Sequence, residues 1–586
     1  MEESSKPSFS GFVYKYFNWF GGPLSRVFFS NGHARVEEAL EDAGIKMYPQ
    51  AYFSLVGFLF IVVMIITVPT AILSGFLPIL LVPLLVILLG YAVPNVMSRD
   101  RAQKLDMEVP FAGTYISVMA TGGLSPYASM RRLKNCPLLP NISKTVKDME
   151  VDVQVKGYDP VTAMEKSAQH LPSKDYRDLL MGYASTLRTG GDVIHYLLVR
   201  TETMFRDLAI QVKAFGDRAA MLMESYIAIS ILVTLSLTIL FMTSIAFANF
   251  WQGFFTVDNF LLYSYFIVPI ISILFIYMGD MSAFHEPINE WGPYKVLLAT
   301  SPIFMFMLLT MFVPFAAPEI APGFHQPFSN AIIWLRQVLA LERGYEASLG
   351  IALALIVWTA PAAFAHSYYM RRGKGLESDI THFLRDLTEA RKTGASPEKC
   401  IETLAGRKYG GFTKQLQVTS RQIRWGLPFK VIYDTFKTKI KSWLPQIDIY
   451  LLVDAVEVGG GSPETLETLT RFSEMFSSLE KEKKETLRPL IIMPYIGAAI
   501  LLFSTVVFMG FMRFVLYSFG RQSMPFGEFA TLLLPPLILQ VWLTGLVTGK
   551  ISSGTLSSGF KHATILVIAA IVLMVFSGYM SMPFQW

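Results

Sequence analysis

Long uncharged stretches are the strongest pattern in the chain. No charged residue occurs between Met47 and Ser98, a run of 52 positions. A helix needs about 20 apolar residues to cross a bilayer core, so this run predicts two spans joined by a tight turn at Gly75 and Pro78. Continuous apolar runs do not fit the alternating strands of a membrane barrel. One further span is predicted in each of seven later runs: Ser225–Val257, Asn259–Gly279, Val296–Pro318, Ala347–Met370, Pro489–Met512, Phe529–Gly549 and Ala563–Trp586.

Two polar stretches, residues 98–220 and 371–488, interrupt these runs, and each is the size of a small domain. Both stretches show the pattern of helices. In the second stretch one apolar stripe recurs at three- and four-residue spacing, formed by Ile380, Phe383, Leu384, Leu387 and Ala390. The fold predicted is therefore all-α, a polytopic membrane protein with about nine transmembrane helices and two helical-bundle domains.

The two polar stretches repeat the same residues that end one helix and begin the next. Gly123-Leu124-Ser125-Pro126 in the first is matched 271 residues later by Gly394-Ala395-Ser396-Pro397, which suits a helix end followed by the start of the next helix. Further on, Gly190-Gly191 is matched by Gly459-Gly460-Gly461, and Arg200-x-x-x-Met204-Phe205 by Arg471-x-x-x-Met475-Phe476. Three matches in the same order, at offsets of 269–271, predict an internal duplication. Between these matches, Cys136–Gly157 aligns poorly with Cys400–Gly426.

The distribution of Lys and Arg predicts the orientation. If the N-terminus is cytoplasmic, 46 of the 50 Lys and Arg residues lie on the cytoplasmic side. We therefore expect a multi-pass protein of the cytoplasmic membrane, with the N-terminus inside and the C-terminus outside. The expected parts are a cytoplasmic N-terminal amphipathic segment (1–50), a transmembrane hairpin (51–97), a first cytoplasmic helical domain (98–220), transmembrane helices three to five (221–316), helix six (345–370), a second, homologous cytoplasmic helical domain (371–488) and helices seven to nine (489–586).

Composition narrows the class of protein further. Charged residues make up 16% of the 586 positions and hydrophobic residues 52%, whereas an ordinary soluble domain is about 25% charged. Residues 11–29 are too polar for a signal peptide and predict either an interfacial amphipathic segment or an ordinary folded segment. Cys136 and Cys400 alone cannot form a disulfide framework or a four-ligand zinc site, and the eight histidines are scattered. We therefore expect no metal and no cofactor.

The sequence offers only an incomplete match to a nucleotide-binding motif. The nearest approach to a phosphate-binding loop runs from Gly545 to Ile551, but three residues rather than four separate Gly545 from Gly549, and Ile551 stands where a hydroxyl is needed. The expectation is therefore that the protein is not an enzyme. Gly545 and Gly549 instead form a GxxxG pair that would let two helices pack closely, or they are ordinary helix-end glycines. Transport is a further alternative. It would need ionisable groups at mid-membrane depth, which the span interiors almost lack, or helix breaks at Pro269, Pro302, Pro361 and Pro535-Pro536.

One cationic cluster stands apart from the predicted spans in the sequence. Lys437, Lys439 and Lys441 lie at two-residue spacing within the second polar stretch. They predict either a contact with an acidic protein partner or a simple solvated face.

The duplicated pattern resembles a known family. An apolar stripe, a Gly-x-Ser-Pro segment and a later Gly-Gly turn before a long span resemble the F domain of type II secretion and type IV pilus systems, over residues 100–245 and 376–512. The added N- and C-terminal spans resemble the archaeal branch, which includes the archaellum assembly protein FlaJ and TadC-like pilus proteins. One departure is Pro110, where the second copy has Thr381.

This resemblance implies a platform without catalysis of its own. Such proteins bind a separate hexameric secretion ATPase and couple it to the insertion of pilin or archaellin subunits at the filament base. The partners implied are that ATPase, the filament subunits, the lipid bilayer and a second copy of the chain in a dimer, with no nucleic acid. The archaellum is the preferred system. The alternatives are an archaeal adhesion-pilus or secretion platform and, from a different class, a membrane transporter or an unrelated membrane scaffold.

Overall fold

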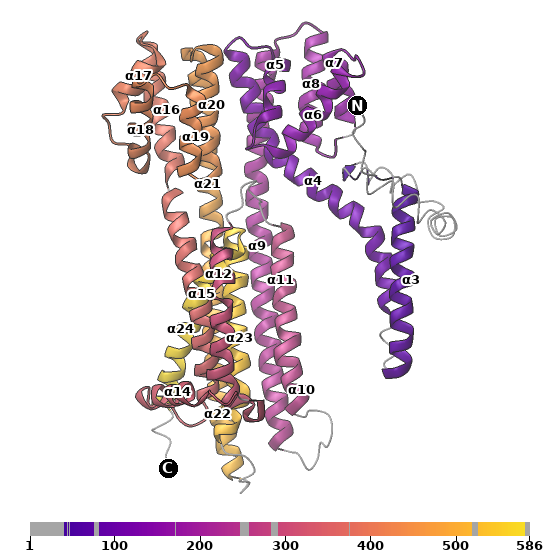
Figure 1. Cartoon of the computed structure of the whole chain (residues 1–586), viewed down its shortest axis with the longest axis vertical. Helices are drawn as coiled ribbons and strands as arrows, with labels where there is room; N and C mark the ends of the chain where they lie inside the picture. Colours follow the sequence, from indigo (N-terminus) through magenta and orange to yellow (C-terminus); the bar gives the residue numbers. More distant parts are fainter. Residues whose placement is uncertain are drawn as a thin grey trace. The chain divides into compact units, whose positions relative to one another are not determined.

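The computed structural model describes residues 49–74, 81–169, 171–246, 257–282, 291–320, 322–373, 375–518 and 526–580, with residues 40, 42, 43, 45 and 47 ahead of them. Across these ranges every regular element is a helix, as predicted (Figure 1). The predicted amphipathic segment at residues 11–29 and the predicted turn at Gly75 and Pro78 lie outside the described residues.

The α-helices follow one another along the chain from α3 to α24. They are α3 (Pro49–Ser74), α4 (Leu81–Thr121), α5 (Pro126–Arg132), α6 (Pro140–Gln154), α7 (Pro160–Gln169), α8 (Lys174–Arg188), α9 (Val193–Ala246), α10 (Val257–Leu262), α11 (Val268–Ser282), α12 (Gly292–Met307), α13 (Val313–Ala316), α14 (Gln326–Val338), α15 (Glu346–Gly373), α16 (Leu376–Lys392), α17 (Pro397–Leu404), α18 (Thr413–Arg424), α19 (Phe429–Lys439), α20 (Trp443–Gly459), α21 (Pro463–Leu487), α22 (Ile492–Ser518), α23 (Phe526–Ser553) and α24 (Leu556–Met580). Single π-helical turns at Tyr263–Ile267 and Leu308–Phe312 adjoin α11 and α12.

Eight helices among the described residues are long and apolar enough to cross a membrane. Each of them coincides with one of the predicted uncharged runs. The ninth predicted span falls within residues 75–98, of which 75–80 lie outside the described residues and the rest form the beginning of α4. The protein is therefore an all-α, multi-pass membrane protein.

The spans near the C-terminus pack around α23. This helix is 83% buried over its most apolar window, the highest value of the eight spans, and it packs against α11, α15 and α24 (Figure 1). An aromatic stack joins three helices, with ring centroids 4.4 Å apart for Phe304 and Trp358 and 5.5 Å apart for Trp358 and Trp542. Because α12, α15 and α23 continue through their internal prolines, Pro302, Pro361 and Pro535-Pro536 mark no helix break. Pro269 is the second residue of α11, which directly follows the π-helical turn at Tyr263–Ile267.

The same succession of helices occurs twice. We call α4–α9 the first repeat and α16–α22 the second repeat, in which α16, α17, α18, α19 and α20 take the places of α4, α5, α6, α7 and α8. The poorly aligning stretch of the sequence contains α6 and α18. Helix α6 ends three residues before Gly157 and α18 ends two residues before Gly426, and both glycines have φ +70°. Only glycine adopts this left-handed conformation without strain. Gly157 and Gly426 are therefore equivalent positions, and they align α6 with α18 where the sequences alone do not.

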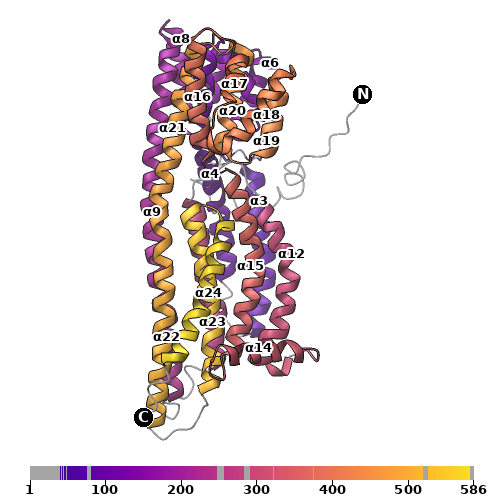
Figure 2. The same ribbon diagram turned by 90° about the vertical axis from the view of Figure 1, so that its left-hand side faces the viewer.

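The long helices that end the repeats lie side by side (Figure 2). The helices approach each other closely at two glycines, Gly216 of α9 and Gly497 of α22. A Cβ on Gly216 would lie 2.0 Å from Cγ2 of Thr486, and one on Gly497 would lie 2.7 Å from Cγ2 of Ile227. The chain also divides into two compact units. One comprises the described residues up to Leu208 with Thr388–Pro397 and Ile449–Phe472, so it contains parts of both repeats.

Candidate functional site

Each repeat holds its last short helix to its first helix through a carboxylate and a serine. In the first repeat the Ser173 hydroxyl donates to Asp106 Oδ1 at 2.5 Å, and in the second the Ser442 hydroxyl donates to Glu377 Oε1 at 3.2 Å. Each serine immediately precedes its helix, α8 or α20. The two carboxylates are 271 positions apart, so the same contact is made twice.

A second carboxylate, two positions further on, caps the middle helix of each repeat. Glu108 accepts hydrogen bonds from the backbone N–H groups of Asn141 and Ile142, both at 2.9 Å, at the start of α6. Asp379 accepts one from the N–H of Gly411 at 2.8 Å, just before α18. An anion at a helix N-terminus satisfies N–H groups that have no partner within the helix and interacts favourably with the helix dipole. These two pairs of carboxylates are therefore a duplicated structural device.

Burial sets the electrostatics of these carboxylates. It raises the pKa of Glu108 to about 7, although the hydrogen bonds from Asn141 and Ile142 act in the opposite direction. Burial likewise raises the pKa of Asp106 and of Glu377. In each case the low-polarity surroundings disfavour the charged form.

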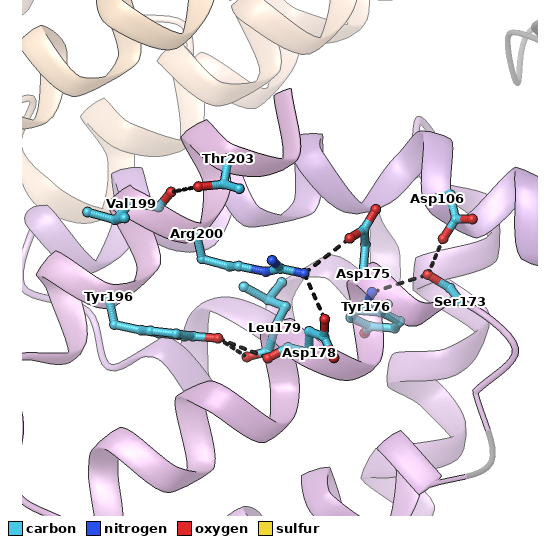
Figure 3. A network of polar contacts seen from close by, with 10 residues as sticks. All are labelled: Asp106, Ser173, Asp175, Tyr176, Asp178, Leu179, Tyr196, Val199, Arg200 and Thr203. Atoms are coloured by element: carbon cyan, nitrogen blue, oxygen red, sulfur yellow. Dashed lines mark hydrogen bonds and ion pairs between the residues drawn. The ribbon is translucent and has the colours of Figure 1, made fainter. Parts of the chain in front are cut away.

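The first repeat adds a network of polar contacts around Arg200 of α9 (Figure 3). Its guanidinium pairs with Asp175 at 3.1 Å and Asp178 at 3.2 Å, both on α8. The Tyr196 hydroxyl donates to the carbonyl of Asp178 at 2.9 Å, and Gly182 leaves room for the Tyr196 ring, since a Cβ there would lie 1.9 Å from the hydroxyl oxygen. This network fixes the start of α9 against α8.

The equivalent arginine of the second repeat has a different role. Arg471 pairs at 2.6 Å with Glu202, which lies on α9 of the first repeat. Next to it, the rings of Phe205 and Phe472 have centroids 6.1 Å apart. The sequence match between Arg200 and Arg471 therefore hides a functional difference, because one joins helices within a repeat and the other joins the two repeats.

Asp454 of α20 is the centre of this contact between the repeats. It accepts a hydrogen bond from the Tyr115 hydroxyl and pairs with Arg132 at 2.8 Å, and both partners belong to the first repeat. Its side chain is 11% exposed. The rings of Tyr115 and Tyr450 stack with centroids 6.1 Å apart. Burial, followed by the nearby Asp454 charge, raises the pKa of Tyr115, which keeps its hydroxyl protonated as the donor.

The predicted lysine cluster lies at the end of α19. Lys439 and Lys441 are exposed and Lys437 is half-buried, and none of the three forms an ion pair with another described residue. Ser442, the next residue, contacts the last residue of α15: a Cβ on Gly373 would lie 3.3 Å from Ser442 Cβ. The cluster, distant from any span in the sequence, therefore lies beside the end of one in the structure.

Gly545 and Gly549 both face α24 from within α23. A Cβ on Gly545 would lie 2.2 Å from Ala563 Cα, and one on Gly549 would lie 2.1 Å from Gly559 Cα. The segment that loosely resembled a phosphate-binding loop is helical throughout. A close approach of two backbones is the geometry that small residues permit in membrane helices.

A second cationic surface, unpredicted from the sequence, lies on α17 and α18 of the second repeat. A cavity of about 520 Å³ between these helices is lined by residues that include Lys399, Glu402, Arg421 and Arg424. Trp425, which follows at the end of α18, is 76% exposed. Arginine and tryptophan are the residue types most enriched at the energetic centres of protein interfaces. We call Arg421, Arg424 and Trp425 the α18 surface.

The first repeat presents different charges here. With Gly157 in the place of Gly426, the positions of Arg421, Arg424 and Trp425 hold Asp152, Val155 and Lys156, and Lys156 is paired with Asp152 at 2.6 Å. The two repeats thus share a scaffold but present different surfaces at the same place.

The sequence reasoning missed the carboxylates, Asp454 and the α18 surface. A signal for the first was present, because Asp106-Met107-Glu108 and Glu377-Ser378-Asp379 stand at the same offset of 271 as the Gly-x-Ser-Pro match. No sequence signal pointed to Asp454, whose partner Arg132 is 322 positions away. Among the described residues no group of three or more His, Cys, Asp or Glu side chains could hold a metal ion.

The fold and these contacts define a multi-pass membrane protein built around a duplicated helical domain. That domain is the one of type II secretion system protein F, which matches residues 114–241 and 383–510, so the predicted duplication and family resemblance are confirmed. The two matches support a membrane platform role in secretion or pilus assembly. An uncharacterized protein of Methanocaldococcus jannaschii is 20% identical over 519 residues, covering 84% of this chain and 83% of its own length. No solved structure matches the chain.

Proposed function

We propose that this protein is the cytoplasmic-membrane platform of an archaellum or type IV pilus-like filament and that it couples a separate hexameric secretion ATPase to subunit insertion. The observation that carries the proposal is the presence of the protein F domain twice in one chain, each copy leading into membrane spans. Catalysis belongs to the partner in this proposal, and the chain itself supplies anchoring and force transmission. The N-terminus and both helical domains face the cytoplasm, as the Lys and Arg distribution favours.

The differences between the repeats suit this role. A hexameric motor acting on one chain needs a docking surface and a rigid connection to the membrane. The α18 surface offers exposed Arg421, Arg424 and Trp425, which we assign to an acidic surface of the ATPase. The contact at Asp454 would then transmit movement from the second repeat to the first. The cluster at Lys437, Lys439 and Lys441 is an alternative docking point for the motor.

Within this class the archaellum is preferred on length and span count, and an adhesion-pilus or secretion platform is the second candidate. The filament subunits would be inserted beside the spans, and a dimer of the platform would be the working assembly. A transporter is not favoured, because α12, α15 and α23 run unbroken through their prolines. No specific contact favours an unrelated scaffold.

Deletion of the gene tests the proposal. Cells that lack the protein should lose one class of surface filament in negatively stained electron micrographs, and expression of the intact chain should restore it. Loss of swimming with retention of adhesion would assign the archaellum, and the reverse would assign an adhesion pilus. Unchanged filament numbers together with unchanged protein secretion would overturn the proposal.

A further inference from the structure

The lysine cluster lies at the level where a span ends. The uncharged run of α15 ends at Met370, and Gly373, three residues further, contacts Ser442. At 1.5 Å per residue, Gly373 is about 5 Å along the helix axis from the last uncharged residue. The headgroup layer on each side of a bilayer core is roughly 5–7 Å thick. Lys441, adjacent to Ser442, therefore lies at headgroup depth.

Charged groups of both signs lie near the cluster. Glu377 connects the start of α16 to Ser442 by a hydrogen bond of 3.2 Å, and the charge of Lys484 on α21 acts on the same carboxylate. Exposed Arg371 lies near the end of α15, where the span leads into the second repeat. Exposed Arg488 lies between α21 and α22, where the repeat leads into the next span. The neighbouring Lys484 is paired with Glu480 at 3.2 Å, whereas Lys439 and Lys441 have no ion-pair partner among the described residues.

The first repeat lacks this charge. With Ser173 in the place of Ser442, the positions of Lys437, Lys439 and Lys441 hold Ala168, His170 and Pro172, and none of these is a lysine or an arginine. The cations are therefore not a requirement of the shared fold. They are an addition confined to the repeat that also carries the α18 surface.

We propose that Lys437, Lys439 and Lys441 bind anionic phospholipid headgroups at the end of α15 and so hold the second repeat against the membrane surface. Each lysine near an anionic bilayer surface strengthens the association by about fivefold, and the attraction weakens with salt. An acidic protein partner is the less favoured occupant, because the cluster lies at headgroup depth and the lysines carry no exposed aromatic residue among them. The inference does not depend on the proposed function.

Fluorescence quenching in nanodiscs tests the proposal on the full-length chain. Thr438 is exposed and bonds only to the carbonyl of Thr435, so Thr438→Cys places a fluorophore within the cluster. Cys136 and Cys400 are buried and do not compete for the label. The probes are headgroup spin-labelled phosphatidylglycerol and, at the same fraction, headgroup spin-labelled phosphatidylcholine. We expect phosphatidylglycerol to be at least fivefold enriched near the label at low salt.

The variant Lys437→Glu, Lys439→Glu, Lys441→Glu should abolish this preference. A matched variant of three exposed cations elsewhere on the same repeat, Lys414→Glu, Arg421→Glu, Arg424→Glu, should leave it unchanged. Equal quenching by the two lipids in the native chain would overturn the proposal. So would a lysine variant that keeps the lipid preference but no longer binds the secretion ATPase, which would assign the cluster to a protein partner. Because the readout is lipid quenching, a failure here leaves the proposed platform role standing, and the converse also holds.

Discussion

Arg132 of the first repeat and Asp454 of the second form an ion pair of 2.8 Å that joins the two repeats. Asp454 is nearly buried, at 11% exposure, and also accepts the Tyr115 hydroxyl. A carboxylate in such a position has exchanged water for two protein donors. When one donor is removed, the remaining charge is left without its full set of partners, which costs more than the pair itself contributes.

The first prediction concerns this pair. Arg132→Ala should destabilise the first repeat by about 1–3 kcal/mol, because Asp454 then stays buried with Tyr115 as its main donor. The measurement is the unfolding midpoint of the purified protein in detergent. The matched control is Arg385→Ala, which removes a more exposed pair with Glu474, 58% and 42% exposed, and should lower the unfolding midpoint much less. Equal shifts for the two variants would refute the buried role of Asp454.

The second prediction is a pH dependence that arises from Glu108. Its pKa in the folded protein is about 7, above the value of 4.5 for an exposed glutamate. The folded state therefore binds the proton more tightly than the unfolded state, so the contribution of Glu108 to stability is complete below pH 4.5 and is lost as the pH rises through 7. The loss amounts to roughly 3 kcal/mol at pH 8.

Thermal unfolding between pH 5 and pH 8 checks this prediction. The native protein should become less stable across the window, and Glu108→Gln should flatten the slope because it removes the titrating group. Part of the slope should persist, since burial also raises the pKa of Asp106 and Glu377. A native protein that gains stability toward pH 8 would contradict the prediction.

The third prediction concerns the contact between α23 and α24. Gly545→Ala would place a methyl group 2.2 Å from Ala563 Cα, so the helices must separate, and we expect a loss of about 1–3 kcal/mol. Gly510→Ala is the control, because a Cβ on Gly510 of α22 meets nothing within 4 Å. That change should be neutral or raise stability by up to about 1 kcal/mol, as alanine is the better helix former. Equal melting temperatures for the two variants would exclude Gly545 from close packing.

The fourth prediction concerns orientation. Native Cys136 and Cys400 are buried, so neither reports topology, and an engineered exposed cysteine is needed on each side. Gln417→Cys on α18 should react with a membrane-impermeant maleimide only after the cells are opened, whereas Gln337→Cys on α14 should react in intact cells. The reverse pattern would mean that the helical domains lie outside.

Residue patterns predicted most of the architecture because membrane spans are local features. An uncharged run such as Pro489–Met512 needs no distant partner to be recognised, and α22 coincides with it. The glycine and proline that end and begin helices are local as well. That is why the match between Gly123 and Gly394 correctly aligned the repeats, and both residues adopt positive φ.

Contacts between residues far apart in the sequence could not be predicted from such local patterns. Lys441 is 71 positions from Met370 in the sequence, yet its neighbour Ser442 contacts Gly373, a proximity that only the return of α19 toward α15 creates. Asp454 likewise gave no signal, because an acidic residue near a helix end is ordinary until Arg132 and Tyr115 converge on it. The alternation of residue types reports which face of a helix is buried, but not which helix covers it.

If this chain is a passive membrane platform that recruits a separate motor, the motor should bind to membranes that contain it, and co-flotation measures that binding. Liposomes that contain the full-length protein are mixed with the secretion ATPase of the same organism and centrifuged through a density gradient. The ATPase should float with the liposomes, its affinity should fall at least tenfold with Arg421→Glu, Arg424→Glu, and it should be unchanged by Lys437→Glu, Lys439→Glu, Lys441→Glu. An ATPase that stays at the bottom of the gradient, or ATP hydrolysis by the liposomes without it, would rule out a passive platform.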